Sequence, residues 1–294
     1  MTLITSFDPW HSNLCKCPKK LTFNPYTGCD HHCIYCYASS YIPNHQQIRT
    51  KKSLLSNLKR EAAKLNGEIL ALSNSSDPYP TIEAKLELTR QCLRIIAASD
   101  CRLQIITKSD LVTRDIDLIK NMNCTVTLTL TTLKDELAEI LEPQAPPPSR
   151  RLKAIYNLVS HGIPVAVRID PIIPTLNDNP AKLISQLAKL GVKHITSSTY
   201  KVKPDNWTRL KLALPKTAET IAPLYFGRGE KVGGNLLLPK SIRFKIMKKI
   251  SELVQTHGLM FGVCREGFNE LNSASCDGSW LLPKIKESKI CGHA

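Results

Sequence analysis

Three cysteines lie within eight residues of one another, in the segment CDHHCIYC that runs from Cys29 through Cys33 to Cys36. Their spacing is C-x3-C-x2-C, and thiols this close in sequence cannot form disulfides with one another without strain. A structural zinc site needs four protein ligands, whereas three ligands on one loop leave one coordination position of a metal centre open. The spacing therefore predicts a metal centre with an open position, where chemistry can occur.

Two histidines inside the same segment, His31 and His32, are rival ligands for that metal. We interpret them as polar residues of the loop. A zinc ion, or thiols that bind no metal, are the alternatives for the three cysteines. The flanking sequence, treated below, favours a redox-active centre over both.

Five more cysteines are dispersed toward the two ends of the chain. The pair Cys15 and Cys17 is too tight to form a disulfide and too short to form a whole metal site, so a site there needs distant partners. Cys264, Cys276 and Cys291 are the available thiols near the C-terminus. One hypothesis is a second site, zinc or an auxiliary cluster, formed by Cys15, Cys17, Cys264 and Cys276; the other is separate buried thiols.

The chain has 294 residues and 42% hydrophobic residues, which is enough for one large α/β domain with extensions. The first residues lack a basic region followed by a long apolar run, and no segment approaches 18 uninterrupted apolar residues. We therefore expect a cytoplasmic protein without a membrane segment. Eleven cysteines in a reducing compartment are expected to be free, buried or bound to metal.

Short apolar, β-branched runs alternate with amphipathic helical patterns along the first two thirds of the chain. The predicted strands are 21–24, 68–73, 102–107, 125–130, 164–169 and 194–198, and the predicted helices are 53–65, 82–98, 115–121, 149–160 and 181–190. Repeated units of this kind predict an α/β fold with a parallel sheet, and sites in barrels of this type lie on the loops after the strands. Periodicity alone leaves a doubly wound sheet open.

The cysteine loop and its flanks carry a family resemblance. With an aromatic residue, Tyr35, before the third cysteine, the loop resembles the cluster loop of the radical S-adenosylmethionine (SAM) superfamily, and the flanks NPYTGC (24–29) and CYA (36–38) resemble its spore photoproduct lyase branch. The resemblance implies that Cys29, Cys33 and Cys36 bind three irons of a [4Fe-4S] cluster, whose fourth iron binds SAM. It also implies a partial, laterally open (β/α)6 TIM-type barrel and an electron donor such as flavodoxin or ferredoxin.

We expect three parts: an N-terminal extension (1–20), the barrel (21–202) and a basic C-terminal extension or cap (203–294). Within the last part a helix is predicted at 241–257 and a strand at 259–264. The cap is expected to cover part of the open side of the barrel and to carry substrate specificity.

Polar clusters follow the predicted strands and offer the donors and acceptors that a zwitterionic ligand such as SAM needs. By position in the resembling family, the residues expected to bind SAM are Asn74, Ser76 and Asp77 at the amino group, Lys108 at the carboxylate, Thr129 or Thr131 at the ribose, and Tyr35 beside the adenine. Arg168 lies two residues from Asp170, so the two are expected to pair inside the barrel or to orient SAM or a substrate phosphate. Turn formation and strand propensity are the alternative explanations.

Tyr35 and Tyr37 adjoin the cluster ligands and are the candidate catalytic residues, with simple packing as the alternative. In the lyase pattern a cysteine precedes a T-S-D-like sequence after the second strand, and here the corresponding residues are 74–77, NSSD. No thiol occupies that hydrogen-donor position. The resemblance therefore does not extend the lyase reaction itself to this chain.

The formal net charge is +15, and twelve basic residues against three acidic ones lie between residues 196 and 250. Aromatic residues Trp207, Tyr225 and Phe226 are interleaved with them. This pattern favours DNA or RNA as the substrate, because lysines can follow a phosphate backbone while aromatic rings stack on unpaired bases. The alternatives are a radical SAM enzyme that modifies a protein, peptide or metabolite, and a zinc-stabilised nucleic-acid-binding protein without catalysis; a solvated basic surface would explain the charge equally.

Overall fold

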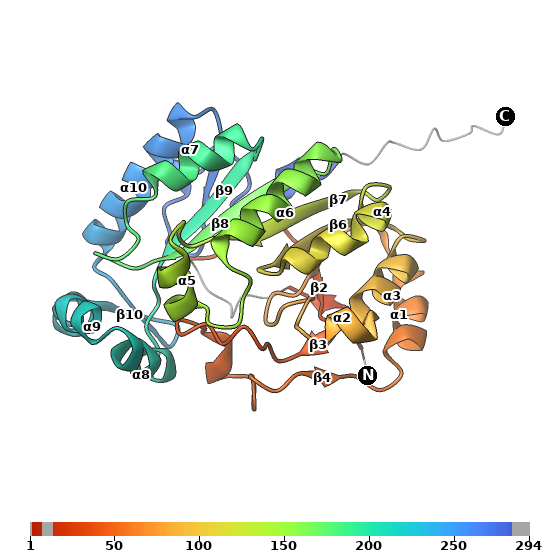
Figure 1. Cartoon of the computed structure of the whole chain (residues 1–294), viewed down its shortest axis with the longest axis horizontal. Helices are drawn as coiled ribbons and strands as arrows, with labels where there is room; N and C mark the ends of the chain where they lie inside the picture. Colours follow the sequence, from red (N-terminus) through yellow and green to blue (C-terminus); the bar gives the residue numbers. More distant parts are fainter. Residues whose placement is uncertain (1, 8–13, 284–294) are drawn as a thin grey trace.

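The computed structural model describes residues 2–7 and 14–283 and contains one eight-stranded sheet in the order β1-β2-β5-β6-β7-β8-β9-β12 (Figure 1). All strands after β1 are parallel to their neighbours, and only β1 is antiparallel to β2. The strands are β1 (Thr5–Ser6), β2 (Leu21–Phe23), β5 (Asn66–Leu72), β6 (Asp100–Thr107), β7 (Cys124–Thr129), β8 (Val165–Ile172), β9 (His194–Thr199) and β12 (Met260–Val263). The predicted α/β class with a parallel partial barrel is confirmed.

All six predicted barrel strands are present, with ends shifted by a few residues. The strand predicted at 259–264 is also present as β12, but it pairs with β9, Phe261 opposite Ile195, and so adds a seventh parallel strand to the sheet. The predicted boundary at residue 202 stays a prediction. The structure adds that the C-terminal part contributes a strand to the barrel wall.

The described residues contain ten α-helices. Figure 1 shows α1, α3, α6, α7 and α10 on the outside of the curved sheet, with α8 and α9 grouped near β10. The helices are α1 (Leu54–Ala62), α2 (Glu83–Leu86), α3 (Leu88–Ile96), α4 (Ile116–Ile119), α5 (Asp135–Leu141), α6 (Pro148–Ser160), α7 (Ala181–Lys189), α8 (Pro204–Ala213), α9 (Pro215–Ala222) and α10 (Lys240–Thr256). Short helical turns are η1 (Ala38–Ser40), η2 (Asp110–Asp115), η3 (Pro223–Gly227), η4 (Asn269–Leu271) and η5 (Ser279–Leu281).

The helix predicted at 82–98 is two helices, α2 and α3. Glu87 between them adopts a left-handed conformation with φ 48°. The buried carboxylate of Glu83 accepts the backbone N–H of Thr89 at 2.9 Å, so a side chain satisfies the first turn of α3. A long-range capping contact of this kind has no signal in hydrophobic periodicity.

Alternation along the strands gives the sheet one apolar and one polar face. On β8, Val165 and Val167 belong to the hydrophobic core beneath the helices, whereas Arg168 and Asp170 line a cavity on the inner face. On β7, Val126 and Leu128 lie in the same core. Because side chains alternate between the two faces of a strand, the polar candidates on the strand ends point toward the inside of the barrel.

Two small antiparallel pairs lie outside the main sheet: β3 (Tyr26–Thr27) with β4 (Arg49–Thr50), and β10 (Glu230–Val232) with β11 (Asn235–Leu237). Within the described part of the chain, none of the helices is both long enough and apolar enough to cross a bilayer. The ten described cysteines all carry free thiols. Cys291 lies outside the described residues.

Candidate active site

A cavity of about 560 Å³ lies inside the barrel at the carboxyl ends of the strands, and Cys29, Cys33 and Cys36 all line it. The cavity also brings together most of the predicted site residues, namely Tyr35, Tyr37, Asn74, Ser76, Asp77, Lys108, Thr129 and Arg168. Thr131 does not line it; its hydroxyl donates to the Glu142 carboxylate at 3.2 Å instead. Of the two threonines named for a ribose, the geometry favours Thr129.

The first cysteine is fixed by close backbone packing. Gly28 has φ +88°, and a Cβ atom at this position would lie 2.3 Å from the carbonyl oxygen of Gln47. Only glycine fits both the conformation and the approach. The adjoining Cys29 donates its backbone N–H to the carbonyl of His45 at 2.7 Å, so the segment around residues 45–47 holds the start of the loop.

The end of the loop is held by Arg209 of α8. Its guanidinium donates to the carbonyls of Cys36 at 2.7 Å and Ile34 at 3.1 Å and pairs with Asp205 at 3.2 Å. From the sequence, Arg209 was one of the basic residues expected to contact phosphates. In the structure it holds the cysteine loop instead, and α8 therefore lies beside the site.

Tyr35 lies between the second and third cysteines and is buried. Its hydroxyl donates to Glu142, and the other carboxylate oxygen of Glu142 pairs with Arg151 at 2.5 Å. The ammonium of Lys108 lies 5.6 Å from the centroid of the Tyr35 ring. The ring is thus fixed at the cavity wall by a buried charged network that sequence reasoning did not identify.

Burial raises the pKa of the Cys33 thiol to about 12, with Lys108 opposing this effect. A bound metal ion reverses that preference because it replaces the proton on sulfur. Burial disfavours the charged form of Lys108, but Cys33 and Glu142 outweigh it, so the pKa of Lys108 is raised. Lys108 therefore stays a cation that can donate to a carboxylate in the cavity.

Asp77 joins the loops after β5 and β6. Its carboxylate accepts the Thr107 hydroxyl at 2.6 Å, the Lys108 N–H at 2.9 Å and the Tyr79 N–H at 2.9 Å, and it lies 3.2 Å from His31. Burial raises its pKa, but His31 and the hydrogen bonds outweigh burial and lower the pKa to about 2. A permanent negative charge therefore faces the cavity, and the same residue forms the turn at Pro78.

The remaining loop after β5 is also organised by hydrogen bonds. Asn74 donates to the Thr22 hydroxyl at 2.8 Å, Ser76 donates to the Tyr26 carbonyl at 3.1 Å, and the Tyr37 hydroxyl donates to the Asn74 carbonyl at 3.3 Å. Ser73 lines the cavity, and its buried hydroxyl has no partner among the described residues. A buried polar atom without a partner is expected to meet a bound molecule.

Arg168 and Asp170 form the predicted ion pair at 2.6 Å on the inner face of β8. Ser198 of β9 donates to the second oxygen of Asp170 at 2.5 Å. The guanidinium also hydrogen-bonds to the sulfur of Cys264, which lies on the same cavity. Arg168 thus faces the cavity from β8.

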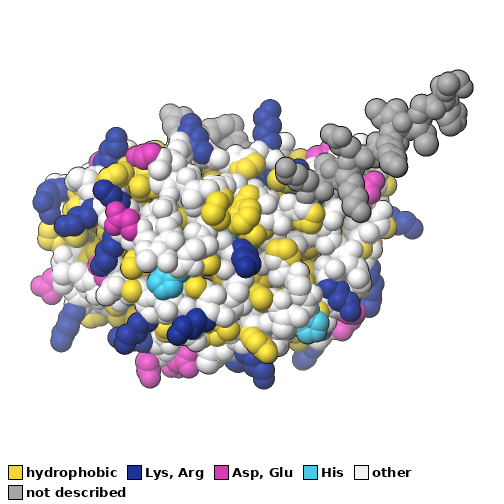
Figure 2. Space-filling model, turned by 90° about the horizontal axis from the view of Figure 1, so that it is seen from above, with side chains coloured by type: hydrophobic (Ala, Val, Ile, Leu, Met, Phe, Trp, Pro, Cys, Tyr) yellow, Lys and Arg dark blue, Asp and Glu magenta, His cyan; other side chains and the backbone are white. Residues whose placement is uncertain are grey.

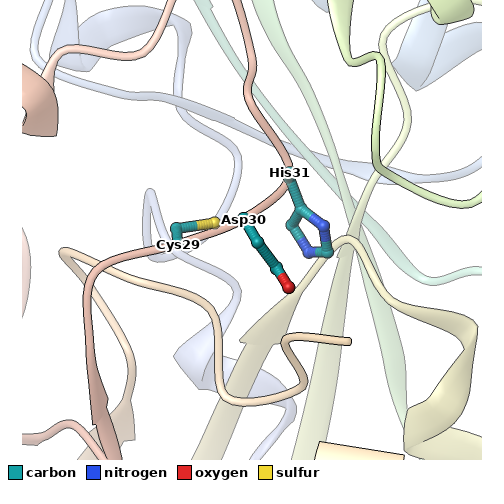
Figure 3. A group of neighbouring side chains, drawn as sticks. All are labelled: Cys29, Asp30 and His31. Carbon is teal, nitrogen blue, oxygen red and sulfur yellow. The ribbon is translucent and has the colours of Figure 1, made fainter. Parts of the chain in front are cut away.

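The two histidines that we interpreted as polar loop residues differ in burial: His31 is buried and His32 is exposed. Figure 3 shows Cys29, Asp30 and His31 together on one stretch of the loop, and their ligand atoms lie within 4.8 Å of one another. One oxygen of Asp30 accepts the Thr81 N–H at 2.9 Å, and His31 Nε2 lies 3.2 Å from the Asp77 carboxylate. The other Asp30 oxygen and His31 Nδ1 are buried without a hydrogen-bond partner among the described residues.

Residues 23–197 match the family model described as the Radical SAM superfamily. The chain belongs to this superfamily. Radical SAM proteins bind a [4Fe-4S] cluster and SAM, and these are the cofactors of this chain. The residues present fit them: three free thiols on one loop can hold three irons, and the cavity adds a fixed anion, a fixed cation and an unpaired hydroxyl.

Two curated relatives are uncharacterized proteins. One, from Methanocaldococcus jannaschii, is 36% identical over 166 residues, covering 54% of this chain and 62% of the relative. The other, from Mycobacterium tuberculosis, is 29% identical over 205 residues, covering 63% of this chain and 59% of the relative. The chain therefore matches about three fifths of each relative's length.

Among solved structures, spore photoproduct lyase in complex with a dinucleoside spore photoproduct is similar with a TM-score of 0.60 and 18% identity, covering 79% of this chain and 71% of the lyase. At this identity the likeness shows a shared fold. It agrees with a radical SAM partial barrel and leaves the substrate open.

Proposed function

We propose that this radical SAM enzyme acts on a base of a nucleic acid, to repair or modify it. The observation that carries the proposal is an open groove that shares a residue, Asn235, with the active-site cavity. With both cofactors bound, the reduced cluster and SAM supply a 5′-deoxyadenosyl radical that abstracts hydrogen from a substrate. The protein must then bring one base to that cavity while holding the strand outside.

The groove has the composition that single-stranded nucleic acid requires. Its volume is about 480 Å³, and its lining includes Trp207, Phe226, Lys203 and Lys231. The rings of Trp207 and Phe226 lie edge to face with centroids 4.9 Å apart, and Phe226 is 57% exposed. An exposed ring between two lysines can stack on a base while the ammonium groups contact phosphates.

The wider surface supports a polyanionic partner. Of the twelve basic residues between 196 and 250, the exposed ones are Lys211, Lys216, Arg228, Lys231, Lys240, Lys245, Lys248 and Lys249. Figure 2, seen from above, shows Lys and Arg side chains at the left edge, the side on which α10 lies in Figure 1, and also along the bottom and right edges. Two members of the set are structural: Arg209 holds the cysteine loop, and the buried Arg243 pairs with Glu266 at 3.0 Å.

Within the cavity we assign Cys29, Cys33 and Cys36 to the cluster, Lys108 to the SAM carboxylate and Asp77 with Asn74 and Ser76 to the side of its ammonium. Thr129 serves the ribose. The fixed charges of Lys108 and Asp77 support opposite ends of a zwitterion. Arg168, which lines the cavity while paired with Asp170, is assigned to orient SAM or a substrate phosphate.

The lyase solved with a dinucleoside photoproduct supports nucleic acid as the substrate class for this fold. The reaction need not be the same, because Asn74 stands where the lyase pattern has its cysteine. A base modification or a different repair reaction is compatible with the same cavity.

The experiment measures 5′-deoxyadenosine release by reconstituted, dithionite-reduced enzyme with SAM, with and without single-stranded DNA or RNA. We expect a polynucleotide to raise product formation, and Cys33→Ala to abolish it. Lys203→Ala/Lys231→Ala should weaken polynucleotide binding and reduce the slope of log Kd against log salt by about two.

The matched control is Lys245→Ala/Lys249→Ala, which removes the same charge from exposed positions of α10 that do not line the groove. Equal losses in both variants would mean a diffuse basic surface without a site. Stimulation by a peptide or a small metabolite, with no effect of polynucleotide, would replace the nucleic-acid proposal with the protein or metabolite alternative.

A further inference from the structure

The second group of cysteines comes together on the active-site cavity. Cys15, Cys17 and Cys264 line the same cavity as the three ligands of the SAM cluster. Cys276 joins them: its sulfur lies 3.5 Å from the sulfur of Cys17, although 259 positions separate the two residues. Seven of the chain's eleven cysteines thus lie on or beside the wall of one cavity.

The four sulfurs form a contiguous group. The thiol of Cys15 hydrogen-bonds to Cys17, and Cys17 in turn contacts Cys276. Cys264 lies near Cys17 on the wall of the same cavity. The sulfur of Cys264 is hydrogen-bonded by Arg168 on the cavity wall.

Several specific contacts hold Cys276 at this position. A Cβ atom on Gly262 of β12 would lie 2.5 Å from the Cα of Cys276, so only glycine allows the loop to cross there. Thr196 of β9 donates to the carbonyl of Cys276 at 3.0 Å. The neighbouring Asp277 pairs with Lys20 at 2.6 Å, and both side chains are buried.

We propose that Cys15, Cys17, Cys264 and Cys276 bind a second iron–sulfur cluster on the wall of the active-site cavity. Four thiolates complete the coordination of such a cluster, so it has no open position for SAM. Two cations lie beside the group, the buried Lys20 and the half-buried Arg168, and each is paired with a carboxylate, Asp277 and Asp170 respectively. This site is independent of the substrate class proposed above.

The four sulfurs are not arranged as a preformed tetrahedral zinc site. In a tetrahedral zinc site with four cysteine ligands the sulfurs lie about 3.8 Å apart, since each zinc–sulfur bond is about 2.3 Å. Among residues 2–7 and 14–283, the only set of three ligand atoms within 4.8 Å of one another is that of Cys29, Asp30 and His31. The sulfurs of Cys17 and Cys276 lie 3.5 Å apart, but no third sulfur of the group lies within 4.8 Å of both, so a zinc ion would require the other two cysteines to move.

The test is the metal content of anaerobically reconstituted protein. The variant Cys29→Ala/Cys33→Ala/Cys36→Ala removes the SAM cluster and should retain about two to four irons per chain, with matching sulfide. When reduced, it should give an electron paramagnetic resonance signal that SAM does not change. Adding Cys17→Ala/Cys276→Ala to this variant should remove the remaining iron.

The matched control is Cys92→Ala/Cys101→Ala, which removes two cysteines that do not line the cavity and should leave the iron content of the wild type. Complete loss of iron in the Cys29/Cys33/Cys36 variant would overturn the proposal, and so would zinc in place of iron. This arm leaves the four proposed ligands intact, so it does not depend on whether the Cys17/Cys276 variant folds. Because it measures iron, failure here leaves the nucleic-acid proposal standing.

Discussion

The hydroxyl of Tyr35 donates to the buried carboxylate of Glu142, which also pairs with Arg151. Tyr35 sits between two cluster ligands, Glu142 follows α5 and Arg151 lies in α6, so one carboxylate joins the cysteine loop to the helical layer. Arg151 also donates to the carbonyls of Pro146 and Thr129. The cluster loop is therefore anchored to the body of the barrel through charge.

Glu142→Gln should lower stability by about 3–5 kcal/mol, because it leaves the buried Arg151 guanidinium without a counter-charge. Urea unfolding followed by circular dichroism measures the difference. Tyr35→Phe is the control: it removes one hydrogen bond but keeps the ion pair, and its cost should be about 1 kcal/mol. Equal costs for the two variants would show that the ion pair contributes nothing beyond the hydroxyl contact.

Gly28→Ala should prevent normal cluster binding. The new Cβ would overlap the Gln47 carbonyl at 2.3 Å, and the loop must shift away from the position that places Cys29. Reconstituted iron should fall well below the wild-type content. Gly162→Ala is a matched control, since Gly162 also has a positive φ, 75°, but open space around it. It should cost about 1 kcal/mol of stability and leave the iron content unchanged.

Arg209→Met should speed loss of the cluster to an iron chelator several-fold. The substitution keeps most of the apolar stem of the side chain but removes the donors to the carbonyls of Ile34 and Cys36, each worth about 1.5–3 kcal/mol when the donor is charged. The rate of bleaching under anaerobic conditions measures the effect. Lys211→Met on the same helix removes an exposed charge and should bleach at the wild-type rate. Identical rates in both variants would contradict a role for Arg209 in the loop.

His194 should make the fold sensitive to mild acid. Burial lowers its pKa to about 4, with Asp277 opposing, whereas an unfolded histidine has a pKa of about 6.5. Because the folded pKa is the lower one, this contribution is fully present above about pH 6.5 and is lost as the pH falls toward 4. Between pH 7 and pH 5 the loss should be about 2 kcal/mol.

Urea unfolding of the cluster-free apoprotein at both pH values tests this expectation against His194→Gln. The glutamine can keep hydrogen bonds to Thr196 and to the Trp280 indole N–H but does not titrate. The variant should lose about 2 kcal/mol less than the wild type over the same interval. Parallel pH profiles would assign the acid sensitivity to other groups.

Local sequence patterns predicted the strands and helices of the barrel, but they did not predict contacts between residues far apart in the sequence. The alternation of Val126 and Leu128 with threonines reveals a strand with one apolar face, and the cysteine spacing reveals the cluster loop, because both signals lie within a few residues. Arg209 is 173 positions from the carbonyl of Cys36 that it binds, and nothing in its local sequence separates it from the exposed lysines around it. Such partners follow only from the fold.

The same reasoning applies to the cavity wall. Ser73 and Glu142 have no motif, and each is identified by burial and by what surrounds its polar atoms. Thr131 and Thr129 alternate on the same stretch, but only Thr129 lines the cavity; β7 ends at Thr129, and Thr131 lies in the loop beyond it and turns toward Glu142. Strand ends are where sequence periodicity is least informative.

The loop at residues 275–278 has a consequence for how the enzyme matures. Asp277 reaches Lys20 at the start of the barrel and Gln104 on β6, yet the ribosome makes it after every barrel strand. Domains fold from the N-terminus as they emerge during synthesis, so the nascent barrel remains unfinished until this last loop inserts. Nascent chains arrested before residue 275 lack these contacts to Lys20 and Gln104, so they should not retain a stable cluster.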